Sequence, residues 1–340
     1  MQRLDRSEDS KFVARGVAHL PLPAVRDPVT VAFVLLPKFT LLAFTSAIEP
    51  LRVANQLAAQ ALFRWTVYSH DGAPVTSSCG LPVVPDGALP KEPEADYLLV
   101  CGGVEPELAL RPGIADCLRA QWRMGRTVGG LCTGAYALAH AGILKGKRFT
   151  LHWENISGFR ETFPDLEPVR RIFCVEQRIL TCAGGVAAAD LMLMLIGERF
   201  GPALGQEVMN MCLLSRRRKG DEEQMVSLAS RLGTRNARLL KAVAYMETRI
   251  EEGFDMAACA AHVGITRRQI ERLFADHLGI SPLNYMNDLR LQHGRTLLAD
   301  TNMTVVEVAM ACGYLSSAHF AKSFRRKFGM TPHRFSHFGG

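Results

Sequence analysis

The chain has 340 residues, 48% of them hydrophobic, which predicts about two globular domains and excludes collagen-like and wholly disordered proteins. No run of about 20 apolar residues is present, so no transmembrane helix is expected. The net charge of +7 arises in the C-terminal third, where residues 216–340 hold 19 Lys and Arg against 12 Asp and Glu. This asymmetry predicts a nucleic-acid-binding module beside a neutral one.

The N-terminus and the cysteines indicate the cellular compartment. Residues 1–27 begin with a polar stretch of mixed charge that lacks an apolar signal core, and they predict a flexible tail and a cytoplasmic protein. The nine cysteines form no C-x-x-C pair and no zinc-ligand spacing. Free thiols are therefore expected, mostly buried, with no metal site and no cofactor.

Residues 28–214 alternate apolar β-branched runs with helical spacing, which predicts an α/β domain with a parallel sheet. The expected strands cover 29–37, 63–72, 95–103, 127–132 and 178–185, and the expected helices cover 42–59, 113–125 and 186–201. Ligands bind beyond the carboxyl ends of such strands. Gly102, Gly103, Cys132 and Gly184 all fall at these ends, so we expect them to converge on one pocket.

The stretch "TVGGLCTGAYALAH" from Thr127 to His140 has the layout of a nucleophile elbow. In such an elbow, a strained strand-to-helix turn lifts a reactive side chain above a sheet. Cys132 occupies the nucleophile position. Three interpretations are open: a working nucleophile, the floor of a binding pocket, or a buried thiol without ligand contact.

The C-terminal domain, expected over residues 234–340 after a charged linker at 215–233, contains an internal repeat. The segments 257–285 and 305–335 align Gly264 with Gly313 and Phe274 with Phe324. Each copy has the pattern of a helix, a Gly-opened turn and a second helix, which is typical of a helix-turn-helix unit. Polar and basic residues occupy the face of each second helix opposite the predicted core.

This segment resembles the DNA-binding domain of AraC/XylS-family transcription regulators, through "RRQIERLFADHLGISPLNYMNDLRLQHGRTLLAD" and "TVVEVAMACGYLSSAHFAKSFRRKFGMTP". The resemblance implies two helix-turn-helix units that enter successive major grooves of double-stranded DNA. The positions that would contact base edges are Arg268, Glu271, Arg272, Ser317, His319 and Lys322. The positions that would contact phosphates are Arg267, Ser316, Arg325 and Arg326. Ala318 replaces a frequent polar base reader.

The first domain resembles the PfpI-protease and isonitrile-hydratase branch of the class I glutamine amidotransferase-like superfamily, through "ADYLLVCGG", "GGLCTGAYALAHAGILKGKRFTLHW" and "LTCAGGVAAADLMLML". The order of the two domains is that of GlxA-type AraC regulators. The implied fold is a flavodoxin-like parallel sheet with flanking helices, followed by an all-α domain with two helix-turn-helix units. The family also implies a homodimer, contact with RNA polymerase and, usually, transcriptional activation.

We expect the residues that activate the cysteine in these enzymes to be replaced. A His follows the Cys in the protease-like members, whereas Thr133 stands here, and Ala43 aligns with the acid that other members place in the first helix. Glu49 lies where a second acid of that helix usually falls, and His152 is a further candidate base. We therefore expect a regulator that senses a small molecule without catalysis; the alternative is an active cysteine hydrolase or amidase tethered to DNA.

The resemblance to these regulators also implies an effector that is an amino acid or a quaternary amine. Backbone N–H groups at strand ends suit a carboxylate, and Trp153 offers an aromatic face to a cation, unless it is packed in the core. The candidate ligand-binding residues are Gly102, Gly103, Cys132, Thr133, His152, Trp153 and Gly184.

Overall fold

The computed structural model describes residues 11–109, 112–224, 228–251 and 254–337. The chain divides into two compact units, one formed by Met1–Ile156 and Phe163–Gln224, the other by Ser157–Thr162 and Met225–Gly340. Among the described helices, none has both the length and the apolarity needed to cross a membrane.

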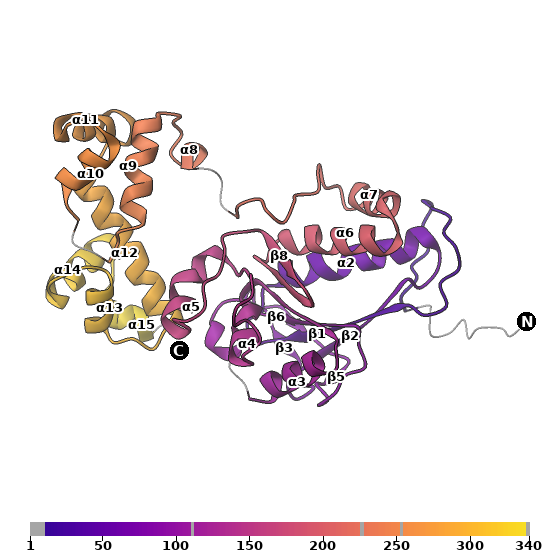
Figure 1. Ribbon diagram of the computed structural model, residues 1–340. Helices are drawn as coiled ribbons and strands as arrows, with labels where there is room; N and C mark the ends of the chain where they lie inside the picture. Colours follow the sequence, from indigo (N-terminus) through magenta and orange to yellow (C-terminus); the bar gives the residue numbers. More distant parts are fainter. Residues whose placement is uncertain (1–10, 110–111, 225–227, 252–253, 338–340) are drawn as a thin grey trace, which may run out of the picture. The chain divides into compact units, whose positions relative to one another are not determined.

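The first unit is built on a seven-stranded sheet in the order β5-β2-β1-β6-β7-β9-β8, which confirms the predicted α/β class (Figure 1). All neighbouring strands are parallel except β8, which pairs antiparallel with β9 at the edge. The strands are β1 (Val29–Leu35), β2 (Phe63–Ser69), β5 (Gly87–Ala88), β6 (Tyr97–Cys101), β7 (Thr127–Leu131), β8 (Phe173–Glu176) and β9 (Ile179–Cys182), with a small hairpin of β3 (Val75–Thr76) and β4 (Pro82–Val83). The short strands β3, β4 and β5 and the edge strand β8 were not expected from the sequence.

Helices cover both faces of the sheet, as expected for parallel strands that are buried on both sides (Figure 1). One face carries α2 (Leu41–Ala58), α6 (Ala187–Phe200) and α7 (Pro202–Met211), and the other carries α3 (Pro112–Arg123) and α4 (Ala135–His140). The remaining short helices of residues 106–162 are η1 (Pro106–Ala109), η2 (Cys132–Gly134), η3 (Trp153–Asn155) and α5 (Ile156–Thr162).

The segment of residues 11–27 differs from the expected flexible tail. The Leu20 N–H donates to the Leu57 carbonyl at 2.7 Å, and the Val25 N–H donates to the Gln60 side-chain oxygen at 2.9 Å. Apolar side chains of this segment pack on the core of the α/β unit. The first ten residues of the expected tail lie outside the described part of the chain.

The charged segment of residues 215–224, expected to begin a linker, is bound to the α/β unit. The Arg218 guanidinium forms an ion pair with buried Asp190 at 2.7 Å. The Gln224 side-chain nitrogen donates to the Leu151 carbonyl at 2.8 Å. On the other side of residues 225–227, which lie outside the described part, α8 (Leu228–Arg231) packs in the second unit.

The second unit is helical and repeats itself, as the sequence predicts. Its helices are α8, α9 (Ala237–Glu247), α10 (Met256–Val263), α11 (Arg267–Leu278), α12 (Pro282–Asp300), α13 (Val305–Ala311), α14 (Ser317–Phe328) and α15 (Pro332–His337). One core is formed by α9, α10, α11 and the start of α12, and a second core by the end of α12 with α13, α14 and α15. The long helix α12 therefore connects the two cores.

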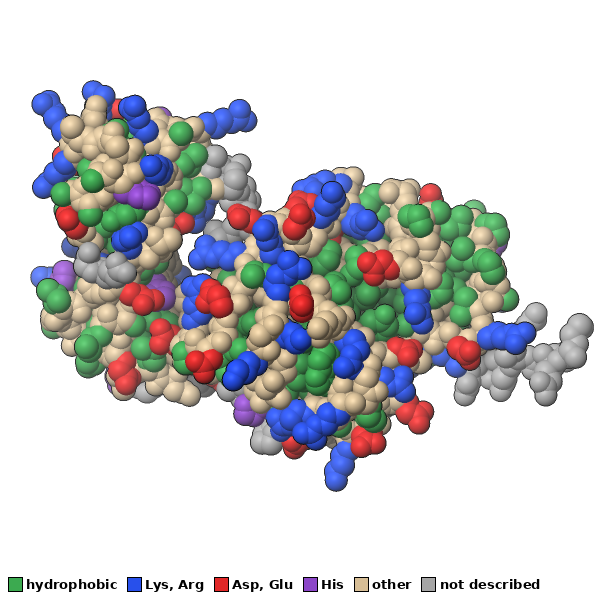
Figure 2. Space-filling view, in the orientation of Figure 1, with side chains coloured by type: hydrophobic (Ala, Val, Ile, Leu, Met, Phe, Trp, Pro, Cys, Tyr) green, Lys and Arg blue, Asp and Glu red, His purple; other side chains and the backbone are tan. Residues whose placement is uncertain are grey.

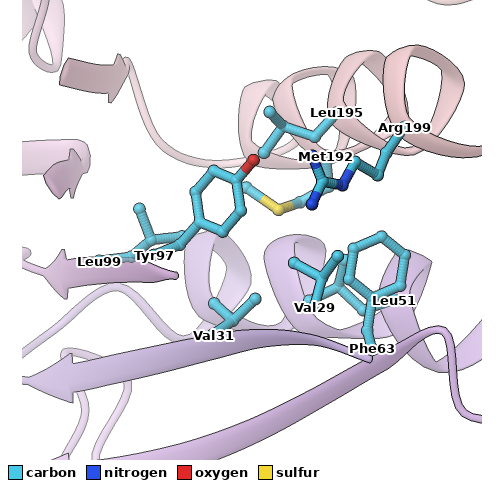
Figure 3. Close-up of a pocket in the computed structure, with 9 residues that line it drawn as sticks. All are labelled: Val29, Val31, Leu51, Phe63, Tyr97, Leu99, Met192, Leu195 and Arg199. Carbon is cyan, nitrogen blue, oxygen red and sulfur yellow. The ribbon is translucent and has the colours of Figure 1, made fainter. Parts of the chain in front are cut away.

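A small cavity lies between the sheet and α6, at the amino ends of β1, β2 and β6 (Figure 3). Its volume is about 10 Å³, and its lining is apolar apart from Tyr97 and Arg199. A cavity of this size holds one water molecule at most, and an apolar lining favours a dry one. Since it lies at the end of the sheet opposite Cys132, it is a packing defect rather than a metabolite site.

Asn55 fastens α2 to the start of β2 from a fully buried position. Its side-chain oxygen accepts hydrogen bonds from the Leu62 and Phe63 N–H groups, each at 2.9 Å, and its nitrogen donates to the Phe63 carbonyl at 2.8 Å. An apolar side chain here would remove the partner of the Phe63 N–H and of the Phe63 carbonyl, whereas the Leu62 N–H would keep the Gln60 carbonyl at 3.1 Å. Each buried polar group left unpaired costs about 1–3 kcal/mol.

We therefore predict that Asn55→Leu lowers the free energy of unfolding of the α/β unit by about 3 kcal/mol. Tryptophan fluorescence during urea unfolding of the full chain measures it, because all three tryptophans lie between residues 65 and 153. Glu49→Gln, which removes an exposed ion pair with Arg52 on the same helix, is the matched control. Equal losses in both variants would contradict the prediction.

Candidate functional site

The predicted elbow is present at the end of β7. Cys132 follows Leu131 directly, begins η2 and has a φ of +58°, in the left-handed region that non-glycine residues rarely adopt. Gly184, at the end of β9, approaches so closely that an added Cβ would lie 2.6 Å from Cys132 Cβ. The turn is therefore enclosed by neighbouring strand ends.

Two further residues with a strained backbone lie at the same carboxyl end of the sheet. Lys38 follows β1 with a φ of +57°, and Glu105 follows β6 with a φ of +60°. Their side chains form an ion pair with each other. Such strain costs about 1–3 kcal/mol per residue and clusters at functional sites. The carboxyl end of the sheet is therefore the candidate site of this unit.

The Cys132 thiol is held in its neutral form. The residue is only 5% exposed, and burial raises the pKa of the thiol above its usual value. A hydrogen bond between the Thr40 hydroxyl and Sγ, 3.5 Å apart, and one from the Thr133 N–H lower the pKa, but burial outweighs them. The carboxylate of Glu154 raises the pKa further.

The residues at the activator positions have other roles. The Thr133 hydroxyl donates to the Gly103 carbonyl at 2.7 Å, and Ala43 is buried in α2. The exposed carboxylate of Glu49 forms an ion pair with Arg52 at 2.7 Å. These residues offer no proton acceptor to Cys132.

His152 approaches the elbow through its main chain. Its N–H donates to the Cys132 carbonyl at 3.4 Å, while its Nδ1 lies 3.9 Å from Glu154 Oε2. Burial lowers the pKa of the imidazole. Within the described residues, no hydrogen bond joins this imidazole to the Cys132 thiol, so His152 is not placed as a base.

The expected lining of backbone amides needs a correction at Gly102. Its N–H donates to the Leu131 carbonyl at 3.1 Å, so this hydrogen bond occupies the N–H that a ligand would need. Close packing explains the glycine, because an added Cβ would lie 2.5 Å from Thr133 Oγ1. The Gly184 N–H is likewise engaged, with the Cys182 thiol.

Apolar side chains surround the elbow instead. Trp153 is 46% exposed, so its alternative interpretation as a core residue is wrong. Leu42, Val104 and Val186 are also exposed, and each lies within two residues of a group that contacts the elbow. The His152 ring lies 5.5 Å from the Trp153 ring and its Nδ1 lies 3.9 Å from the exposed carboxylate of Glu154, so this rim combines an aromatic face with a negative charge.

The second candidate site is the pair of helix-turn-helix units. Helices α10 and α11 meet at Gly264, with a φ of +78°, and α13 and α14 meet near Gly313, with a φ of +68°. Thr266 caps α11 in a reciprocal hydrogen-bonded pair with Gln269, which fixes where this helix begins. Figure 2 shows Lys and Arg side chains gathered around α11.

The predicted contact residues of α11 are on its outer face. Arg268, Glu271 and Arg272 are exposed, whereas Ile270 and Phe274 are fully buried. Arg267 is also exposed, and its Nε lies 2.9 Å from Glu271 Oε1. Glu271 therefore has a partner on its own helix.

The predicted contact residues of α14 divide into two groups. Ser316 caps the helix by accepting from the His319 N–H at 3.4 Å, and Ser317 is half-buried. The exposed imidazole of His319 lies against the Tyr314 ring, with centroids 5.4 Å apart. Lys322, Arg325 and Arg326 are exposed and line a shallow depression of about 500 Å³ with Ala321 and Thr331.

Two contacts that were not expected from the sequence fix α14 and the turn before it on α12. The Lys327 ammonium lies 2.6 Å from the Asp288 carboxylate, and the Tyr314 hydroxyl donates to the Asn287 side-chain oxygen at 2.6 Å. The neighbouring polar residues Asn287 and Asp288 of α12 were the sequence signal from which these contacts could have been expected. Lys327 therefore faces α12 rather than extending the exposed basic end of α14.

Two protein families match the chain, one in each unit. The DJ-1/PfpI family matches residues 29–198, and a helix-turn-helix domain matches residues 259–337. The chain is 41% identical to the HTH-type transcriptional regulator GbdR of Pseudomonas aeruginosa over 91% of its own length and 84% of the relative's. It is 37% identical to the HTH-type transcriptional regulator GlxA of Rhizobium meliloti over 90% of its own length and 95% of the relative's.

Among solved structures, an AraC family transcriptional regulator from Pseudomonas putida is 31% identical. It covers 54% of this chain and 100% of its own, with a TM-score of 0.49.

The electrostatics of the thiols predict which one reacts first. Cys79 is exposed, and hydrogen bonds from the Ser77 side chain and the Leu81 main chain lower its pKa, whereas burial raises the pKa of Cys132. Because the thiolate is the nucleophile, iodoacetamide at pH 7.5 should modify Cys79 well before Cys132. Peptide mass mapping measures both, and Ser77→Ala should slow only Cys79. Faster labelling of Cys132 would contradict the assignment.

Proposed function

Because the chain belongs to the HTH-type transcriptional regulators that combine an AraC-type helix-turn-helix domain with a DJ-1/PfpI domain, we propose that a small molecule at the elbow controls its DNA binding. The observation that carries the DNA-binding assignment is the doubled unit, with exposed basic side chains on α11 and α14 over buried aromatic cores. A DNA-binding regulator acts where the promoter is, so the proposal includes a cytoplasmic location.

Double-stranded DNA would be contacted by exposed side chains of α11 and α14. Arg268 and Arg272 are exposed on α11 and form no ion pair within the described residues, and each can donate two bonds to a guanine edge. Lys322, Arg325 and Arg326 line the depression on α14 and suit phosphates or bases. Arg267, Glu271, Ser316, Ser317 and His319 complete the proposed interface.

The effector is proposed to be an amino acid or a quaternary amine. Its cationic group would lie on the exposed indole of Trp153, where the Glu154 carboxylate adds attraction. Since the Gly102 amide is engaged, a carboxylate of the ligand would depend on the remaining groups near Gly103, Thr133 and His152. Cys132 and Gly184 form the floor of the site.

Replacement of Arg272 distinguishes base reading from phosphate contact. If Arg272 reads a base, Arg272→Ala should cost about 1–3 kcal/mol of binding free energy at the preferred site and relax specificity at one position. Arg272→Lys keeps the charge but loses the planar fork, so it should retain the salt dependence and lose the preference. Fluorescence anisotropy with matched and mutated duplexes measures both. A uniform loss across sequences would make Arg272 a phosphate contact.

Substitution of Cys132 tests whether the protein regulates transcription without catalysing a reaction. Cys132→Ser should leave effector-dependent transcription largely intact, whereas Cys132→Trp should fill the site and abolish the response, and Trp153→Ala should weaken it. A promoter fusion, with a thermal-shift screen of amino acids and methylammonium compounds, measures these effects. Multiple turnovers on amides, esters or isonitriles that Cys132→Ser abolishes would establish the hydrolase instead.

The proposed regulator is a homodimer that activates transcription through RNA polymerase. Apolar side chains remain uncovered at the end of α7, where Leu213 is 92% exposed and Met211 is 39% exposed, and they suit burial against a second copy. We predict a dimer mass for the full chain at micromolar concentration in light scattering. Leu213→Glu should shift the mass toward the monomer, and a monomeric wild type would contradict the proposal.

A further inference from the structure

A groove separate from the elbow runs along the edge strand β8. One wall is formed by β8 and the residues before it, and the other by residues 217–221 of the charged segment. Its volume is about 370 Å³, within the range of metabolite pockets. We call it the edge-strand groove; its lining includes Arg148, Arg171, Val175, Arg217, Lys219 and Asp221.

Positive charge dominates this groove. Five of the lining residues are Arg or Lys, and Asp221 is the one carboxylate among them. Arg218 is neutralised by buried Asp190, and Arg171 donates to the Asp221 main-chain carbonyl. In Figure 2, Lys and Arg side chains gather over the segment that follows α7.

Three of these cations are available to a ligand. Arg148 has only Glu176, at 4.0 Å, and its side chain is 65% exposed. Arg217 and Lys219 are exposed, and neither forms an ion pair within the described part of the chain. Guanidinium and ammonium groups that line one hollow, two of them without an ion-pair partner among the described residues and the third with a distant one, favour an anion there.

The floor of the groove is apolar and its wall is held firmly. Phe173 and Met194 lie beneath the charged rim, and Val175 is 38% exposed. Gly220 packs on Phe173 so closely that an added Cβ would lie 2.7 Å from the ring. The groove therefore has a preformed apolar base below its cations.

We propose that the edge-strand groove binds a small organic oxyanion, a phosphate or carboxylate carried on an apolar body. The oxyanion would contact Arg148, Arg217 and Lys219, and the apolar part would lie on Val175 and Phe173. The site does not depend on the elbow or its effector. Because its wall belongs to the segment that leaves the α/β unit at Gln224, ligand binding would stiffen that exit.

The full-length chain tests the proposal by isothermal titration with phenyl phosphate, phthalate and uncharged phenol. The two anions represent the phosphate and carboxylate sources, and at least one should bind while phenol does not. The double variant Arg217→Gln/Lys219→Gln should weaken that binding at least tenfold. Its matched control, Arg123→Gln/Lys145→Gln, removes two other exposed cations of the same unit and should leave binding unchanged.

Other outcomes would overturn the proposal. Absence of binding by both anions, or equal loss in both double variants, would leave the groove without a ligand role. Loss of anion binding in Cys132→Trp but not in the groove variant would place the anion at the elbow. Loss of duplex affinity in the groove variant without small-anion binding would make the groove a DNA contact. Unchanged tryptophan-fluorescence melting temperatures control for folding.

Discussion

The α/β unit depends on a set of close backbone approaches around Cys132. An added Cβ on Gly134 would lie 2.1 Å from the Val100 carbonyl, and one on Gly130 would lie 2.6 Å from the Ala135 N–H. An added Cβ on Gly102 would likewise overlap with Thr133, and one on Gly184 would overlap with Cys132. These contacts bring the ends of β6, β7 and β9 together and hold Cys132 at its positive φ. The elbow is therefore maintained by packing and by the hydrogen bonds of its backbone and of Thr133, whether or not its thiol reacts.

The second unit uses a different constraint, which is local in sequence, and this explains why its prediction was successful. Thr266 caps α11 three residues from its partner Gln269, and Ile270 and Phe274 follow one turn apart on the buried face. Gly264 and Gly313 take left-handed conformations at the two equivalent turns. Each of these signals lies within a short stretch, so the repeat, its turn glycines and the helical periodicity were enough to predict both helix-turn-helix units.

The features that the sequence did not predict all depend on partners distant along the chain. The amide of Gly102 is engaged by Leu131, on the adjacent strand end, and Arg218 by Asp190, in a helix that ends before the charged segment begins. Residues 215–224, expected to begin a linker, therefore pack on the α/β unit, although their sequence predicts no apolar face. The sequence also did not decide whether Trp153 is buried or exposed, because an aromatic residue near a strand end fits a core and a pocket rim alike.

Burial acts in opposite directions on binding and on catalysis at the elbow. A site that excludes water strengthens the contacts of a bound ligand, but it also favours the neutral thiol, so a nucleophile there requires a base or a positive field. The Thr40 hydroxyl and the Thr133 N–H form hydrogen bonds with Cys132, yet neither group is a base that removes its proton at neutral pH. Glu154 adds a negative charge, which disfavours the thiolate while favouring a cation beside Trp153. The same group therefore opposes turnover and, in the proposed function, would attract the cationic group of the effector.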